Sequence, residues 1–131
     1  MKLLLDNNLP PALAHALSAL CEPENEVVAL RDKSPENVED VDYFGALKSE
    51  GNWAVVSGDR KITRVPHERA AWRESGLTVF FLERGWSKLR YWDICWRLVR
   101  WWPTILVHAQ TTEAGISYLV PITSTKLRVL R

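Results

Sequence analysis

Hydrophobic residues along the chain fall into short solid runs, separated by segments in which they recur every three or four positions. Solid apolar runs are typical of strands that are buried on both faces, whereas a spacing of three or four residues is typical of amphipathic helices. The runs predict six strands, at Lys2–Leu5, Val27–Leu30, Trp53–Ser57, Leu77–Leu82, 105–107 and 116–120.

Prolines and glycines set the expected bounds of the helices between these strands. The periodic segments predict four helices, over residues 10–20, 39–50, 66–74 and 89–102. Asn8 is placed to cap the first helix, because an asparagine side chain can accept a bond from a free N–H of the first turn. Gly51 is expected to end the second helix, and Pro103 is expected to stop the fourth.

The alternation of strands and helices predicts the fold class. Solid apolar strands separated by helices favour an α/β protein, a three-layer α/β/α sandwich with a mostly parallel central sheet. No repeat or linker interrupts the pattern, so residues 1–131 are expected to form a single domain. Trp92, Trp96 and Trp102 follow helical spacing, which favours packing in the core or between subunits. Trp86 and Trp101 do not follow that spacing. A tryptophan surface left exposed would suit a homodimer or a groove for a partner protein.

Composition excludes some classes of function. The formal net charge is +1, so attraction to nucleic acid would have to come from a local basic patch rather than from the whole molecule. No apolar run is long enough to cross a membrane, and the opening MKLLL is interrupted by Asp6, unlike the core of a signal peptide. Cys21 and Cys95 lie far apart without metal-ligand spacing, which indicates two reduced thiols in a cytoplasmic protein.

Three aspartates carry the candidate chemistry. Asp6 follows the first predicted strand and Asp59 follows the third, and the carboxyl ends of parallel strands are where ligands collect in α/β sheets. Asp40 begins the second helix on the same face as Phe44 and Leu47, so we expect it to point towards the sheet. These positions predict one cluster of three carboxylates.

Each aspartate also has a purely local interpretation, as a helix cap for Asp40 and as a turn residue for Asp6 and Asp59. Clustering would be costly without a counter-charge, since two unit charges at 4 Å repel by about 4 kcal/mol at an effective dielectric of 20. A divalent cation is the usual compensation, and ligands that are all oxygens favour Mg²⁺ or Mn²⁺. A metal site of this kind suits hydrolysis of a phosphodiester bond.

The order of these motifs resembles the small PIN-like proteins of the PIN nuclease superfamily. The similarity lies in MKLLLDNNLPP, in Asp40-Val41-Asp42-Tyr43 at a helix start, and in WAVVSGDR, and it covers about residues 1–82. It implies an α/β/α sandwich and a metal-dependent ribonuclease, with Asp6, Asp40 and Asp59 as catalytic residues that hold Mg²⁺ or Mn²⁺. Many similar proteins are VapC-like toxins, so RNA and a cognate antitoxin are the implied partners.

The sequence departs from that family at two points, and alternatives follow. Asn7 stands where related proteins often carry Glu, and no fourth acid follows Asp59 directly, so Glu83 is either a substitute acid or a solvated loop charge. A PIN-like fold that only binds, without catalysis, is one alternative. A phosphoacceptor receiver domain is another, although it would need a lysine after the fifth strand.

Basic residues follow the third aspartate directly. Arg60, Lys61 and Arg64 would lie beside the expected metal, where cationic side chains can contact phosphates of bound RNA.

Overall fold

The computed structural model contains one six-stranded sheet at its centre. The structure describes residues 1–33 and 40–130, apart from the side chains of residues 40–42. The spatial order of the strands is β2-β1-β3-β4-β5-β6, in which the first five are parallel and β6 runs antiparallel to β5. The strands are β1 (Lys2–Leu5), β2 (Glu26–Ala29), β3 (Trp53–Ser57), β4 (Thr78–Leu82), β5 (Ser117–Val120) and β6 (Arg128–Leu130).

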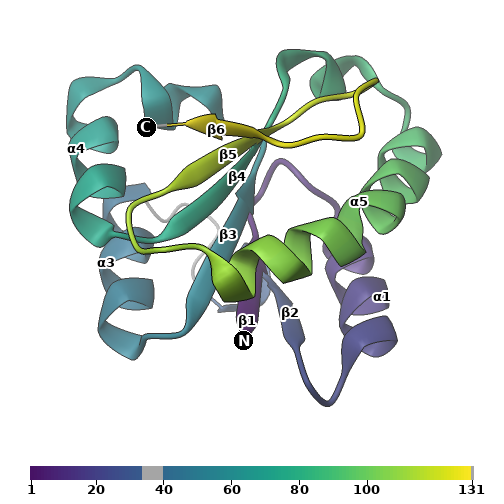
Figure 1. Cartoon of the computed structure of the whole chain (residues 1–131), viewed down its shortest axis with the longest axis horizontal. Helices are drawn as coiled ribbons and strands as arrows, with labels where there is room; N and C mark the ends of the chain where they lie inside the picture. Colours follow the sequence, from purple (N-terminus) through teal and green to yellow (C-terminus); the bar gives the residue numbers. More distant parts are fainter. Residues whose placement is uncertain (34–39, 131) are drawn as a thin grey trace.

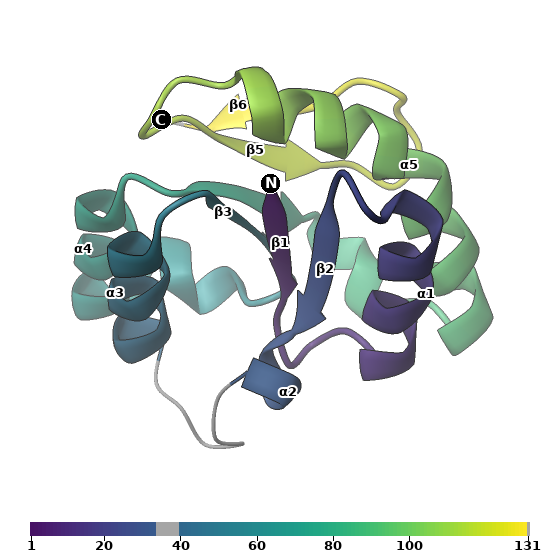
Figure 2. The same ribbon diagram turned by 90° about the horizontal axis from the view of Figure 1, so that it is seen from below.

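Helices cover both faces of this sheet, as Figures 1 and 2 show. Helices α1 (Pro11–Cys21) and α5 (Tyr91–Thr111) lie on one face, and α3 (Asp40–Glu50) and α4 (Pro66–Ser75) lie on the other. Three shorter helices complete the fold, namely α2 (Leu30–Lys33), η1 (Arg60–Thr63) and η2 (Arg84–Lys88). The predicted α/β/α sandwich with a mostly parallel sheet is confirmed.

Alternate residues of each strand enter two separate cores. In β1, Leu3 and Leu5 pack towards α1 and α5, while Leu4 packs towards α3 and α4. The same division runs through β3, where Val56 faces the first core and Val55 faces the second. Solid apolar strands are required because successive side chains point to opposite faces and helices cover both.

Local chemistry explains most helix ends. Pro11 and Pro66 lie in the first turns of α1 and α4, where a missing N–H breaks no helical bond. Gly51 and Gly76 follow the ends of α3 and α4 with φ of 76° and 65°, in the left-handed region that suits glycine. The prediction that Asn8 caps the first helix is wrong, because the cap position is Pro10 and no side chain there bonds the helix N–H groups.

The prediction for Pro103 is also wrong. Pro103 lies inside α5, which continues to Thr111, and the strand expected at 105–107 is therefore helical. Loss of one helical hydrogen bond and the proline clash cost about 3 kcal/mol. Ile105 and Ala109 beyond the proline are buried in the first core, and burial of that second half of the helix opposes the cost.

Other local differences are smaller. The predicted second strand ends one residue early, because Leu30 begins the short helix α2 and packs in the second core. The strand β6 was not predicted, since its residues are mostly exposed and show no apolar run. Both cysteines are free and half-buried. No helix in the described ranges is long and apolar enough to span a bilayer.

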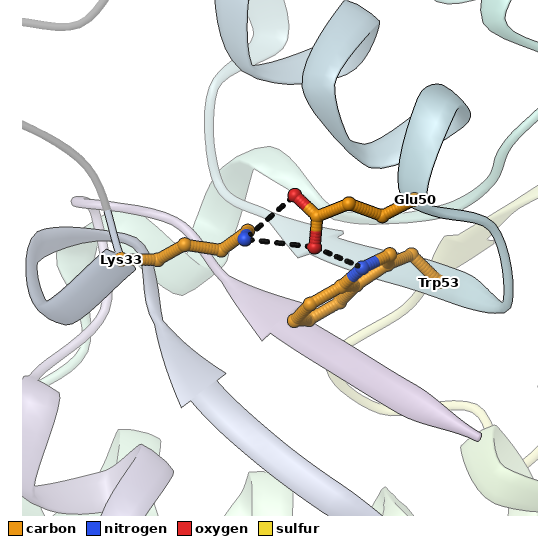
Figure 3. Close-up of polar contacts among 3 residues, drawn as sticks. All are labelled: Lys33, Glu50 and Trp53. Carbon is orange, nitrogen blue, oxygen red and sulfur yellow. Dashed lines mark hydrogen bonds and ion pairs between the residues drawn. The ribbon is translucent and has the colours of Figure 1, made fainter.

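A polar contact joins the ends of α2 and α3 to the start of β3 (Figure 3). Lys33 Nζ donates to both carboxylate oxygens of Glu50, at 2.9 and 2.8 Å, and Trp53 Nε1 donates to the same carboxylate at 3.2 Å. The bond from Lys33 lowers the pKa of Glu50. The contact links α2 and α3, the two helices on either side of residues 34–39 in the sequence. Asp40 is the first residue of α3.

Candidate functional site

Asp6 emerges where β1 ends, beside the end of β3. Its backbone N–H donates to the carbonyl of Val56 at 3.2 Å, so the pairing between the two strands continues one position past β1. The residue is only 4 % exposed. A carboxylate is therefore held inside the sheet edge rather than in solvent.

The Asp6 carboxylate is held by neighbours on both strands. Its Oδ1 accepts the backbone N–H of Asn8 at 3.1 Å, and its Oδ2 accepts the hydroxyl of Ser57, the last residue of β3. Burial raises the pKa of Asp6 from 3.8 to about 6, although the bonds from Ser57, Asn8 and Gly58 lower it in part. Asp6 is thus mostly ionised at neutral pH, and its negative charge is poorly solvated.

Ser57 also connects Asp6 to Asp59. The Ser57 hydroxyl is fully buried, and its oxygen accepts the backbone N–H of Asp59 at 3.0 Å. The negative charge of Asp59 is one of the causes that raise the pKa of Asp6. The structure therefore places these two predicted site residues at the same edge, linked through one serine.

Asp59 itself is half-buried and caps η1. Its Oδ1 accepts the backbone N–H of Lys61 at 2.9 Å. The local interpretations of Asp6 and Asp59 as turn residues are thus satisfied. The bond from Lys61 restrains the Asp59 carboxylate at the start of η1.

The third predicted acid, Asp40, begins α3, and its side chain lies outside the described residues. The prediction that Asp40 points towards the sheet rests on its sharing a helix face with Phe44 and Leu47. These two side chains are fully buried in the structure. Within the described ranges no three His, Cys, Asp or Glu side chains gather closely enough to hold a metal ion. Glu83 therefore does not join Asp6 and Asp59 as a third ligand.

The donor chemistry at this edge fits a hard divalent cation. Asp6 and Asp59 offer carboxylate oxygens only, which Mg²⁺ and Mn²⁺ prefer. The raised pKa of Asp6 is a second observation in favour, because a bound cation would offset the cost of burying an ionised carboxylate. Two carboxylates on neighbouring strand ends could hold such an ion together with water.

The basic residues predicted to bind RNA lie on η1 and just after it. Lys61 and Arg64 are exposed, whereas Arg60 is half-buried and its Nε has no hydrogen-bond partner among the described residues. The three cations follow Asp59 in the chain, so η1 presents positive charge beside the sheet edge that carries Asp6 and Asp59, which we call the acidic edge.

A pocket of about 240 Å³ opens beside the two aspartates. The segments that follow β1 and β3, the end of β4, the helix η2 and the start of α5 all contribute to its lining. The lining residues are Asn8, Leu9, Gly58, Arg60, Leu82, Glu83, Arg84, Trp86, Ser87 and Ile94.

Sequence reasoning missed three contributions to this site. The sequence pattern predicts Ser57 only as the end of a strand, although a serine that closes a solid apolar run is a signal for a buried polar contact. The pattern predicts Asn8 as a helix cap, whereas its backbone N–H donates to Asp6 and the residue lines the pocket. The pattern leaves Trp86 outside the helical spacing of the other tryptophans, whereas it is buried and lines the pocket.

Comparison with known proteins identifies the family. The model of a family described as the PIN-like domain matches residues 1–84, which include β1, β3 and β4 with Asp6 and Asp59. Searches of curated proteins and of solved structures found no match. The matched residues make up more than half of the chain and include both described aspartates of the site, and the protein belongs to the PIN-like domain family.

Proposed function

We propose that this protein is a metal-dependent ribonuclease that hydrolyses phosphodiester bonds of RNA. The observation that carries the proposal is the Asp6–Ser57–Asp59 link, in which the Ser57 hydroxyl donates to the Asp6 carboxylate and accepts the backbone N–H of Asp59, so that both aspartates lie at the ends of neighbouring parallel strands. Membership of the PIN-like family supports the same reaction class.

In this proposal Asp6, Asp40 and Asp59 hold Mg²⁺ or Mn²⁺. A bound cation of this kind supplies an acidified water and stabilises negative charge on the phosphate. Ser57 keeps the Asp6 carboxylate oriented through its hydroxyl, and the cap on η1 keeps Asp59 in place. Arg60, Lys61 and Arg64 hold phosphates of the RNA strand, because guanidinium and ammonium groups donate to phosphate oxygens.

The receiver-type alternative has less support. A phosphoacceptor domain needs a second acid beside Asp6 and a serine or threonine after its fourth strand, whereas this chain carries Asn7 and Glu83 at those positions.

Cleavage of RNA by the pure protein tests the proposal. Wild type should cleave a panel of structured and single-stranded RNAs with Mg²⁺ or Mn²⁺, and EDTA should abolish cleavage. Asp59→Asn should lower the rate at least 100-fold, since the amide keeps the shape but removes the charge that the cation requires. The matched control, Glu24→Gln at an exposed site before β2, should cleave at the wild-type rate.

Cleavage that survives EDTA, or a fully active Asp59→Asn protein, would refute this mechanism. A protein that binds RNA but cleaves none of the panel would instead support the binding-only alternative.

A further inference from the structure

The pocket beside the acidic edge carries an inference about the substrate. We propose that it binds one nucleobase of the RNA, on a nucleotide adjacent to the phosphate that lies beside Asp6 and Asp59, and that guanine is the preferred base. The inference rests on the proposed function for its RNA, but the pocket can be tested by itself. It would make cleavage selective for sequence at one position.

The position of the pocket ties it to the acidic edge. Gly58, one of its lining residues, lies between Ser57 and Asp59 in the chain. A Cβ on Gly58 would lie 3.0 Å from the Cβ of Asn8, so glycine allows the segments after β1 and β3 to approach closely. A base in the pocket would therefore lie within about one nucleotide of the carboxylates.

The apolar wall suits a flat aromatic ring. This wall consists of the apolar lining residues Leu9, Leu82, Trp86 and Ile94, and all of them except Ile94 are buried. The indole N–H of Trp86 donates to the carbonyl of Val120 at 3.0 Å, which holds the ring in place. Bases in protein sites are commonly stacked between aromatic and apolar side chains in this way.

The volume limits the size of the occupant. At about 240 Å³ the pocket is smaller than the roughly 300–1,000 Å³ of sites for drug-sized ligands. One base fits this description better than a whole nucleotide, so the sugar and phosphate would remain outside, towards Asp59.

Two arginines of the pocket lining, Arg60 and Arg84, can contact the phosphate of the bound nucleotide at the pocket mouth. The Arg60 Nε is buried and no described residue accepts its hydrogen, which is a costly state that a phosphate oxygen could relieve. These two cations also offset the repulsion between the RNA backbone and the acids at this edge.

Glu83 supplies a reason for base selectivity. It is half-buried at the end of β4 and lines the pocket, and its backbone N–H is already bonded to the carbonyl of Val120 at 3.0 Å. A carboxylate accepts hydrogen bonds through two oxygens side by side and donates none when ionised. Guanine offers a ring N–H and an amino N–H next to each other on one edge, whereas adenine and cytosine offer only an amino group there and uracil only a ring N–H. Glu83 can therefore pair with guanine through two bonds.

Titration calorimetry with mononucleotides in EDTA tests the pocket without any cleavage. Wild type should bind GMP at least tenfold more tightly than UMP. Glu83→Gln should remove this preference and leave UMP binding unchanged, because the amide presents only one acceptor. Ser87→Trp, from an exposed position on the rim, should fill the pocket and abolish binding of both nucleotides with the fold retained by circular dichroism. Glu113→Gln, exposed in the segment before β5, is the matched control and should bind as wild type.

Equal affinity for GMP and UMP in wild type, no binding of either, or an unchanged preference in Glu83→Gln would each overturn the inference. The outcomes separate the two proposals. GMP preference without RNA cleavage would leave the pocket standing and refute the nuclease, whereas metal-dependent cleavage without nucleotide preference would do the reverse.

Discussion

Among the residues that the structure describes, Asp6 is the carboxylate whose pKa is raised by burial. Its folded-state pKa of about 6 lies above the ordinary 3.8, so the folded protein binds this proton more tightly than the unfolded chain does. The stability that this proton contributes is fully present below pH 3.8 and is lost as the pH rises through 6. A shift of this size corresponds to about 3 kcal/mol.

Replacement of Asp6 by Asn should remove that loss. Relative to wild type, we expect the free energy of unfolding of Asp6→Asn to rise by about 3 kcal/mol between pH 3.8 and pH 8 in EDTA. Urea denaturation across this range measures the difference, and Glu24→Gln is the control that should track wild type. A difference that stays constant with pH would show that Asp6 titrates normally.

Arg60 is the second residue with a testable environment. Each phosphate contact releases about 0.7 counterion from a single strand. Arg60→Ala should therefore weaken RNA binding by a similar factor for all sequences and reduce the slope of log affinity against log salt by about 0.7. Arg128→Ala, on exposed β6, should leave the slope unchanged. An unchanged slope in Arg60→Ala would assign this arginine to structure alone.

At the scale of the elements, α5 shows where sequence periodicity misleads. Trp92 and Trp96 share a helical spacing with Trp102 but are 77 % and 47 % exposed, whereas Trp101 and Trp102 are buried. Apolar residues occupy more than half of the circumference of this helix, so spacing alone could not identify which part of the apolar side is buried. Packing against the sheet determines which side is buried, because the buried residues Leu98, Trp101 and Ile105 are those that face the first core.

Stability should follow burial rather than the sequence stripe. Trp101→Ala should lower the free energy of unfolding by about 3–5 kcal/mol, since it leaves a large cavity in the first core. Trp92→Ala on the same helix should change it by less than about 0.5 kcal/mol. Urea denaturation of both variants measures this, and similar losses in the two would contradict the orientation of α5.

Strands were more predictable than helix ends for a physical reason. A strand buried on both faces must be apolar at every position, so β1, β3 and β4 stand out in the sequence. The edge strand β6 is not subject to this requirement and gave no signal. The course of α5 past Pro103 depended on core contacts of Ile105 and Ala109, which local sequence does not contain.

At the scale of the whole molecule, the parallel order β1-β3-β4 is what assembles the site. Aspartates after strands could be predicted as neighbours, because parallel strands end at one edge. The link through Ser57 could not be predicted, because it is a side-chain contact between residues 51 positions apart. The pocket could not be predicted either, because it joins segments from four parts of the chain.

We propose that Asp6, Asp40 and Asp59 together form one cation site. Thermal melts of wild type, Asp40→Asn and Asp59→Asn with Mn²⁺ and with EDTA test this arrangement. At a Mn²⁺ concentration about 100-fold above the dissociation constant, wild type should gain about 2.7 kcal/mol of stability and either variant almost none. Equal stabilisation of all three proteins by Mn²⁺, or of none, would refute the shared site.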